Sequence, residues 1–348
     1  MNGSKTYFSK KVYYVNMFLA LIIVMLHSYN LDIWEINLSN KSFLVSVACE
    51  QFIRMLSQIA VPTFFSISGY LFYRKYNNKM FCTKVKSRIR SLVIPFLFYN
   101  FLFYMFYVVC THIPFIKTKM NMDMVSFGIV ECVDAIWNSL YSPLWFLRNL
   151  FVYVLLAPLV ELIICKTKRA AIVITLIIVS SLFLKVGYTN PIYFLPQYLF
   201  GALMGYQYKA VIETKNYATI AKILSTALLM LVTVIGMKLY GKYSFMYLYR
   251  AISPIVVWIS LDLLKTHIQR ISFDSWMTRI SFYIYCLHFP ITSIMGKVFK
   301  IILGNNSKLV LMAYFGTVIS TILVIYLSAY LIKKISPSAW QFLNGGRT

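Results

Sequence analysis

The fold is decided by MFLALIIVMLH, residues 17–27, an almost unbroken apolar run that ends in one ionisable side chain, His27. Together with the apolar residues before it, this run is long enough to cross a bilayer as a helix. A polar segment follows it, without the small-residue site at which a signal peptide is cleaved. We therefore expect this helix to remain in the membrane as an anchor.

The rest of the chain has the same apolar character. Of its 348 residues, 60% are hydrophobic and only 13% are charged, and the mean hydropathy is +0.71. These values lie outside the range of soluble globular domains. We predict an all-α fold, a polytopic membrane helix bundle formed by a single domain over residues 1–348.

Apolar stretches of membrane-crossing length recur along the chain. Ten can be marked, at about residues 12–30, 55–73, 91–111, 144–163, 170–187, 191–208, 220–238, 245–264, 280–298 and 309–332. An even number of spans puts both termini on one side of the membrane. Between the third and fourth spans, FGIVECVDAIWNSLY (residues 127–141) has the pattern of an amphipathic surface helix on the outside.

The basic residues of the loops test this topology. With a cytoplasmic N-terminus, the inside segments hold 22 Lys and Arg residues and the outside segments hold 10. This asymmetry follows the positive-inside rule and predicts that both termini are cytoplasmic. Much of the net charge of +24 is then a consequence of topology, so we expect no nucleic-acid partner. The six cysteines show no metal-ligand spacing, and we predict no metal site.

Ionisable side chains inside spans are costly in lipid, so each is a candidate for a functional site. Asn16 and His27 are eleven residues apart, which places them on one helix face, about 16 Å apart along the axis. The ninth span carries a polar stripe on one face, made of Ser281, Tyr285, His288 and Thr292. Two inward histidines favour a shared interior site, although each histidine could instead bond to a neighbouring helix.

Two further sets of basic residues have two interpretations each. Arg148, in SPLWFLRNLF (residues 142–151), is either part of a site or an interfacial arginine that extends to the membrane surface beside Trp145. Residues 74–90, RKYNNKMFCTKVKSRIR, contain seven Lys and Arg and no acid. This loop is explained either by topology and contact with anionic lipid or by a phosphate-rich cytosolic ligand.

Six stretches, taken together and in order, resemble the acyltransferase 3 family of integral membrane enzymes. They are LALIIVMLH (19–27), AVPTFFSISGYLFY (60–73), KSRIRSLVIPF (86–96), PLWFLRNL (143–150), YLFGALMG (198–205) and SFYIYCLHFPI (281–291). The resemblance covers most of the chain. It implies about ten spans and the transfer of acyl groups, usually acetyl, to extracytoplasmic glycans.

The resemblance also implies roles for matching residues. His27 matches the histidine taken as catalytic, and Arg88, seven residues before Pro95, matches an arginine linked to the acyl-CoA site. Asn16 stands where family members usually have an arginine, at the donor end of the first helix, and Lys10 or Lys11 could compensate. Supporting or acceptor-side positions are matched by Ser68, Gly69, Trp145, Arg148, Tyr285 and His288.

The function implied by this family is a membrane O-acetyltransferase in the plasma membrane of a bacterium. We expect no bound cofactor. Acetyl-CoA or another acyl-CoA would be the co-substrate, and a polysaccharide or glycolipid hydroxyl outside would be the acceptor. His27 would act as general base or would carry the acyl group briefly. Arg148, Tyr285 or His288 would stabilise the oxyanion or orient the acceptor.

Other interpretations stay open at this stage. A transporter or flippase for a lipid-linked sugar or small solute would also have ten spans and buried polar residues, although no inverted repeat is visible. A racemase-linked relative would present a soluble catalytic domain, which we do not expect here. Because Asn16 stands where family members usually have an arginine, a structural or interaction protein without enzymatic activity is a third alternative.

Overall fold

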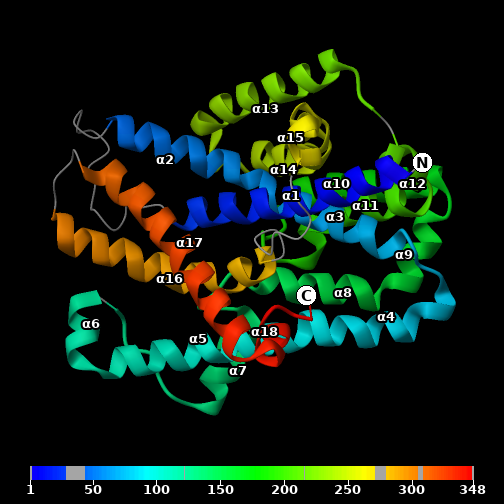
Figure 1. Cartoon of the computed structure of the whole chain (residues 1–348). Coiled ribbons are helices and arrows are strands. Elements are labelled where there is room, and N and C mark those ends of the chain that lie inside the picture. The colour runs from blue at the N-terminus through cyan, green and yellow to red at the C-terminus, as the bar shows by residue number, and fades with distance from the viewer. Residues whose placement is uncertain are drawn as a thin grey trace. The chain divides into compact units, whose positions relative to one another are not determined.

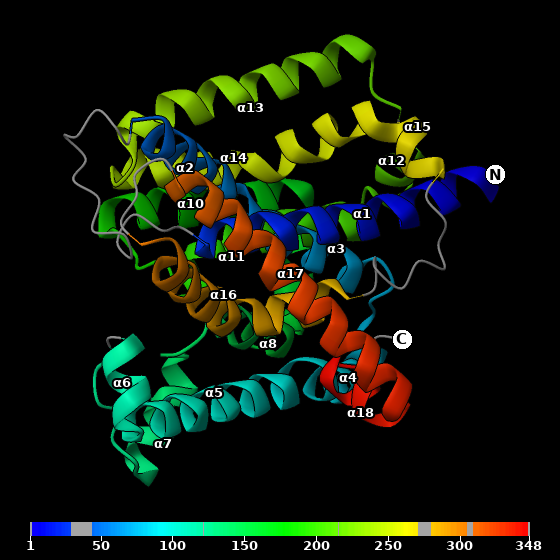
Figure 2. The same ribbon diagram turned by 60° about the vertical axis from the view of Figure 1, so that its left-hand side comes forward.

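The computed structural model describes residues 2–28, 44–120, 122–214, 216–270, 280–304 and 309–346. Every regular element in these ranges is a helix (Figures 1 and 2). The end of the first predicted span, residues 29 and 30, and residues 271–279 of a predicted cytoplasmic loop lie outside the described ranges. The prediction of an all-α fold is confirmed.

Eight helical segments in the described ranges are long and apolar enough to cross a membrane. They are Tyr7–His27, Leu44–Tyr73, Asn78–His112, Thr167–Leu184, Thr219–Leu239, Tyr243–Arg270, Ser281–Leu303 and Val310–Ile335. A bent pair, Trp145–Leu155 and Ala157–Ile164, makes a ninth if it is counted as one span. The remaining predicted span is a helix of 16 residues, shorter than the about 20 that cross a bilayer. The number ten and the cytoplasmic termini stay predictions.

The chain forms two compact units, each built from separate stretches of sequence. The first unit contains Met1–Ile23, Cys49–Val85 and Val152–Ser281, and the second contains Val24–Ala48, Lys86–Phe151 and Phe282–Thr348. Helices α1, α2, α4, α8 and α16 each contribute residues to both units, α16 with only its first residue in the first unit. One domain over residues 1–348 stays a prediction.

The first unit contains most of the helices. They are α1 (Asn2–His27), α2 (Leu44–Leu56), η2 (Ser57–Ile59), α3 (Ala60–Tyr73), η3 (Asn78–Met80), α4 (Phe81–Arg88), α9 (Ala157–Ile164), α10 (Thr167–Leu184), α11 (Pro191–Tyr206), α12 (Lys209–Thr214), α13 (Thr219–Leu239), α14 (Tyr243–Ser260), η5 (Leu261–Leu264) and α15 (Lys265–Arg270). Its core joins the apolar face of α1, represented by Val15 and Leu19, to Ile59 and Met246. Figures 1 and 2 show α13 lying alongside α14.

The second unit contains the remaining helices. They are η4 (Ile89–Val93), α5 (Ile94–His112), α6 (Pro114–Met120), α7 (Ile129–Asn138), α8 (Trp145–Leu155), α16 (Ser281–Leu303), α17 (Val310–Ile335) and α18 (Pro337–Leu343). Figures 1 and 2 show α7 against α5, where Ala135 packs with Tyr104 and Val108. Within the predicted surface helix over 127–141, the residues of α7 are helical, and α7 exposes Ile129 and Trp137. Its position on the outside of the membrane stays a prediction.

Helices α3 and α11 of the first unit pack almost backbone to backbone. A methyl group added at Gly201 would overlap the carbonyl oxygen of Ser66, and one at Gly69 would overlap that of Tyr198. Gly201 and Gly205 form a GxxxG pattern, which lets membrane helices approach closely. Ser66 Oγ also donates a hydrogen bond to the backbone oxygen of Gln197, at 2.9 Å. Glycine is required here by space rather than by backbone conformation.

Two prolines explain where helices break. Pro158 stands near the start of α9 and has no N–H for the carbonyl four residues earlier, so the pair α8 and α9 bends by 69° around Leu156. Pro95 stands at the start of α5, and the turn before it, Ile89–Val93, is a π-helix. A proline ring clashes with the preceding turn, and a wider π turn relieves that clash.

Candidate functional site

Two histidines from distant parts of the sequence meet in the second unit. His27 is the last residue of α1, and His288 lies in the first half of α16. Their ring centroids are 5.1 Å apart with an interplanar angle of 44°. The edge of Phe289 also packs against His27, with centroids 5.0 Å apart. The predicted pairing of two inward histidines is therefore present in the structure.

The hydrogen bonds of His288 define its tautomer. The side chain is fully buried, and Nδ1 lies 2.8 Å from the carbonyl oxygen of Tyr285 and 3.2 Å from that of Ile284. Carbonyl oxygens only accept, so Nδ1 must carry the proton and donate. In the neutral ring Nε2 then holds a lone pair, and among the described residues it has no hydrogen-bond partner. A buried nitrogen acceptor without a partner is unusual and points to a functional role.

Tyr285 holds α16 in place rather than facing an open site. Its hydroxyl donates to the carbonyl oxygen of Pro143, at 2.6 Å, just before α8 begins. Its ring contacts Phe146 edge-on, with centroids 5.7 Å apart, and lies 6.0 Å from the ring of His288. Tyr285 thus connects the start of α8 to the helix that carries His288.

Arg148 binds α7 instead of extending beside Trp145. Its Nη1 donates to the carbonyl oxygen of Trp137 at 2.7 Å, and its guanidinium lies 5.8 Å from the Trp137 ring centroid. Trp145 itself is buried at the start of α8. These contacts attach the amphipathic helix α7 to α8, and a role of Arg148 in the reaction stays a prediction.

Arg88 is the last residue of α4, directly before the π-helical turn Ile89–Val93. The sequence analysis did not predict this turn. Single π turns inside α-helices occur frequently at functional sites, because they reorient the side chains beside them. The signal that could have revealed it is Pro95, seven residues after Arg88.

Three predicted site residues, Asn16, Ser68 and Gly69, belong to the first unit. Asn16 lies half-buried on α1, and Ser68 lies half-buried on α3. Gly69 is accounted for by the close packing of α3 on α11. The structure therefore divides the predicted set, with the histidine pair and Tyr285 together in the second unit.

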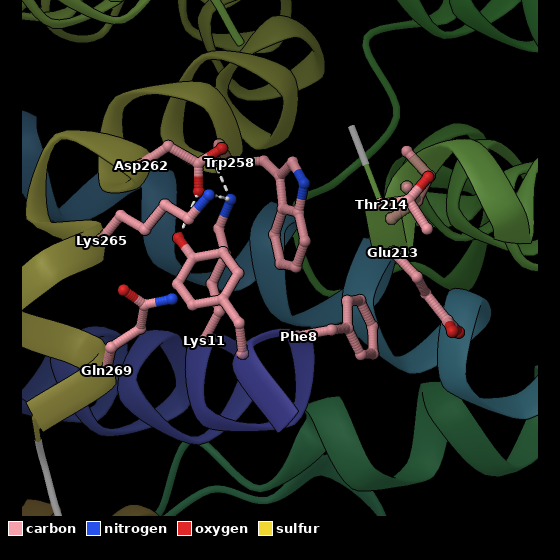
Figure 3. A pocket seen from close by; sticks show the side chains of 10 residues that line it. Phe8, Lys11, Glu213, Thr214, Trp258, Asp262, Lys265 and Gln269 are labelled. Carbon is pink, nitrogen blue, oxygen red and sulfur yellow. Dashed lines mark hydrogen bonds and ion pairs between the residues drawn. The ribbon is translucent and has the colours of Figure 1, made fainter. Parts of the chain in front are cut away.

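The sequence analysis missed a polar pocket of about 200 Å³ in the first unit (Figure 3). Its lining comes from α1, α12, α14, η5 and α15 and includes Tyr7, Phe8, Lys11, Ile212, Glu213, Thr214, Trp258, Asp262, Lys265 and Gln269. Asp262 is an acidic residue at the end of an apolar span, a signal that could have identified the pocket. Lys11 was considered only as a substitute for the missing arginine at position 16.

A buried ion pair forms one wall of this polar pocket. Lys11 Nζ lies 2.6 Å from Asp262 Oδ1, donates to the carbonyl oxygen of Trp258 at 2.7 Å and sits 3.9 Å from the Trp258 ring centroid. The Tyr7 hydroxyl donates to the same carboxylate oxygen at 2.5 Å. Figure 3 shows Lys11 pointing from α1 toward Asp262 and Trp258 of the α14–η5 segment. An ion pair this deeply buried is stable only with such added hydrogen bonds.

An apolar cavity of about 100 Å³ adjoins the polar pocket and shares Phe8, Ile212 and Trp258 with it. Its other walls include Val12, Ile67, Met204, Pro254 and Tyr217. Burial, and secondarily the negative charge of Asp262, raise the pKa of the Tyr217 phenol. Tyr217 therefore remains neutral at physiological pH. In the part of the chain that is described, no group of three or more His, Cys, Asp or Glu side chains could hold a metal ion.

A family model described as an acyltransferase domain matches residues 13–330, most of the chain. The chain belongs to the acyltransferase 3 family. This confirms the resemblance drawn from the six sequence stretches. Together with the apolar helices, it shows a multi-pass membrane acyltransferase.

A curated relative supports the same assignment. The chain is 24% identical over 325 residues to "Succinoglycan biosynthesis protein ExoH" of Rhizobium meliloti (strain 1021). The alignment covers 84% of this chain and 80% of that protein. No solved structure matches the chain significantly. The family membership thus rests on sequence, and the histidine pair shows where two of the predicted site residues meet.

Proposed function

We propose that this protein is an O-acyltransferase of a bacterial plasma membrane. It moves an acetyl or other short acyl group from cytosolic acyl-CoA to a hydroxyl of an extracytoplasmic polysaccharide or glycolipid. Membership of the acyltransferase 3 family supports the reaction class. The ExoH relative is named for the biosynthesis of succinoglycan, which favours a polysaccharide acceptor.

The observation that carries the proposal is the contact between His27 and the buried His288, whose Nε2 has no partner among the described residues. His27 is half-buried and lies at the end of its helix, so an acceptor can approach it. His288 carries this nitrogen lone pair on a ring whose centroid is 5.1 Å from that of His27. Because neutral His288 has its proton on Nδ1, Nε2 offers no N–H to an oxyanion, and its role is to stabilise a charged His27.

In the proposed reaction, His27 acts as general base on the acceptor hydroxyl. The hydroxyl oxygen attacks the thioester carbonyl carbon, and the hydroxyl proton passes to His27. The C–S bond then breaks, and the CoA thiolate leaves and takes up that proton. The lone pair of His288 favours the imidazolium that exists between these two proton transfers. Arg88 contributes positive charge for the phosphates of the donor.

The test compares His27→Ala with a control histidine variant, His112→Ala, at equal expression. His112 ends α5 and its Nδ1 pairs with the Val108 carbonyl oxygen at 2.8 Å. Membranes are given labelled acetyl-CoA, and the label on envelope glycan is measured. We expect transfer to fall at least about 100-fold in His27→Ala and to persist in His112→Ala. Parental transfer by His27→Ala would reject the general-base role, and the absence of any acylated product in the parent would instead favour a transporter.

A further inference from the structure

The charges around the polar pocket of the first unit are unbalanced. Asp262 receives hydrogen bonds from Lys11 and Tyr7, and the positive charges of Lys222 and Lys265 also act on Lys11. Two ammonium groups, those of Lys11 and Lys265, therefore line the pocket with the carboxylate of Asp262, and the charge of a third, that of Lys222, acts on Lys11. The second acid of the pocket, Glu213, is already paired.

Glu213 does not offset the positive charge of the pocket, because its carboxylate is already paired with Arg74. Its Oε1 lies 2.8 Å from Arg74 Nε and accepts a hydrogen bond from the Tyr70 hydroxyl at 3.1 Å. Arg74 thereby neutralises Glu213. The pocket therefore has an excess of positive charge, which comes from Lys222 and Lys265. An anion would be stabilised there.

The size and the donors of the pocket specify the kind of anion. A cavity of about 200 Å³ is smaller than the roughly 300–1,000 Å³ that holds a whole drug-sized ligand, so it fits one group of a larger molecule. Besides Lys265, the side chain of Gln269 lines it and can donate hydrogen bonds, whereas the Thr214 hydroxyl already donates to the carbonyl oxygen of Ala210 at 2.7 Å. Ammonium and amide donors around one cavity suit the several acceptor oxygens of a phosphate group.

The surroundings indicate that the ligand also has an apolar part and comes from the cytosolic side. The adjoining apolar cavity shares Phe8 and Trp258 with the polar pocket. Thr214 and Lys265 fall in two of the loops that the charge pattern assigns to the cytoplasm. A phosphorylated molecule with a less polar arm satisfies both conditions.

We propose that this pocket binds a phosphate group of such a ligand. Resting on the proposed function, the ligand is the acyl-CoA donor, whose nucleotide end carries phosphates and whose pantetheine arm is less polar. Another source of the same chemistry is the headgroup of an anionic phospholipid in the inner leaflet. Lys222 and Lys265 supply the attraction, and the Lys11–Asp262 pair fixes the pocket wall.

The experiment measures binding of CoA to the purified full chain in detergent, without any acceptor. The test variant is Lys222→Ala with Lys265→Ala, and the control is Lys238→Ala, an exposed lysine at the opposite end of the helix that carries Lys222. We expect the double variant to bind CoA about tenfold more weakly, because the phosphate group loses charge-assisted interactions with the two lysines. The control should bind as the parent does.

Two further arms identify the source of the phosphate. In the first, 3′-dephospho-CoA replaces CoA, and a loss of the difference between parent and double variant assigns the pocket to the 3′-phosphate. In the second, the chain is placed in nanodiscs of phosphatidylglycerol or phosphatidylcholine, and retained lipid is counted by mass spectrometry. Loss of phosphatidylglycerol alone supports the phosphate site and assigns it to lipid. Unchanged CoA affinity together with unchanged lipid retention overturns the proposal.

This outcome is separable from failure of the proposed function. Binding is measured with His27 and His288 intact and needs no turnover. If the double variant binds CoA more weakly while His27→Ala membranes still transfer acetyl, the phosphate site is supported and the general-base role of His27 is rejected. If the parent transfers acetyl but the double variant retains both CoA and lipid, the reaction stands and this site falls.

Discussion

His288 presents a buried nitrogen lone pair to its surroundings while its ring lies 5.1 Å, centroid to centroid, from that of His27. The backbone of its own helix fixes this arrangement, because Nδ1–H donates hydrogen bonds to the carbonyl oxygens of Ile284 and Tyr285. A residue placed only for packing would gain more from an apolar side chain at this position. The pair therefore leads directly to the first prediction.

Replacing His288 with Phe keeps an aromatic ring but removes the lone pair beside His27. We expect kcat to fall by about 10- to 100-fold, because the charge that forms on His27 loses stabilisation, with little change in the KM for acyl-CoA. The measurement is steady-state transfer of labelled acetyl by purified protein. In the double variant with His27→Ala, the second loss should add almost nothing, because the two residues act as one unit. Fully additive losses would contradict this coupling.

Replacing Tyr285 with Phe removes the hydroxyl that donates to the Pro143 carbonyl oxygen. We expect a loss of about 1 kcal/mol in stability, because one hydrogen bond is lost and a carbonyl oxygen is left without its donor. Thermal unfolding in detergent measures the change. The matched control is Tyr283→Phe on the same helix, whose hydroxyl pairs more loosely with Ser328 Oγ at 3.3 Å. An equal effect in both variants would argue against a specific role for the Pro143 contact.

Replacing Gly201 with Ala should prevent α11 from packing on α3, since the added methyl group overlaps the backbone oxygen of Ser66. Overpacking in a close interface costs about 1–3 kcal/mol, and a backbone obstacle cannot move aside. We expect less folded protein in size-exclusion chromatography and a lower unfolding temperature. Gly187→Ala is the control, because nothing lies within 4 Å of a methyl group there. Normal yield of Gly201→Ala would contradict the packing described for these helices.

Replacing Asp262 with Ala leaves the ammonium of Lys11 buried without its carboxylate. Breaking a buried pair from one side costs about 3–5 kcal/mol, whereas replacing both partners by apolar residues is often nearly neutral. We therefore expect Asp262→Ala to unfold readily and the double variant Asp262→Leu with Lys11→Met to regain stability. Unfolding temperatures in detergent report both effects. Failure of the double variant to regain any stability would show that the pair does more than balance charge.

Replacing Arg88 with Ala should raise the KM for acyl-CoA about tenfold and leave the dependence on acceptor unchanged, because the guanidinium is proposed to bind donor phosphates. Lys79→Ala, an exposed lysine of the same basic segment, controls for the loss of one charge. Transfer is measured while the concentrations of donor and acceptor are varied separately. A change confined to the acceptor dependence would remove Arg88 from the donor site.

The candidate site residues were chosen from signals that lie within one helix. A buried histidine in lipid is costly wherever it occurs, so His27 and His288 could be selected from their own spans. Gly69 and Arg148 were selected in the same way, but the structure accounts for Gly69 by close packing and joins Arg148 to Trp137. A pattern within one helix marks a special position without naming the partner that explains it.

The sequence by itself determined that this is a helical membrane protein, because apolar runs of this length must bond their own backbone in lipid. It also determined the family and the two costly histidines. Only the tertiary structure decided that His27 meets His288, that Lys11 meets Asp262 and that a π-helical turn follows Arg88. The two contacts join residues that are 261 and 251 positions apart in the sequence. The π-helical turn depends on the local conformation of the backbone. Helical periodicity carries no information about which faces of distant helices pack together.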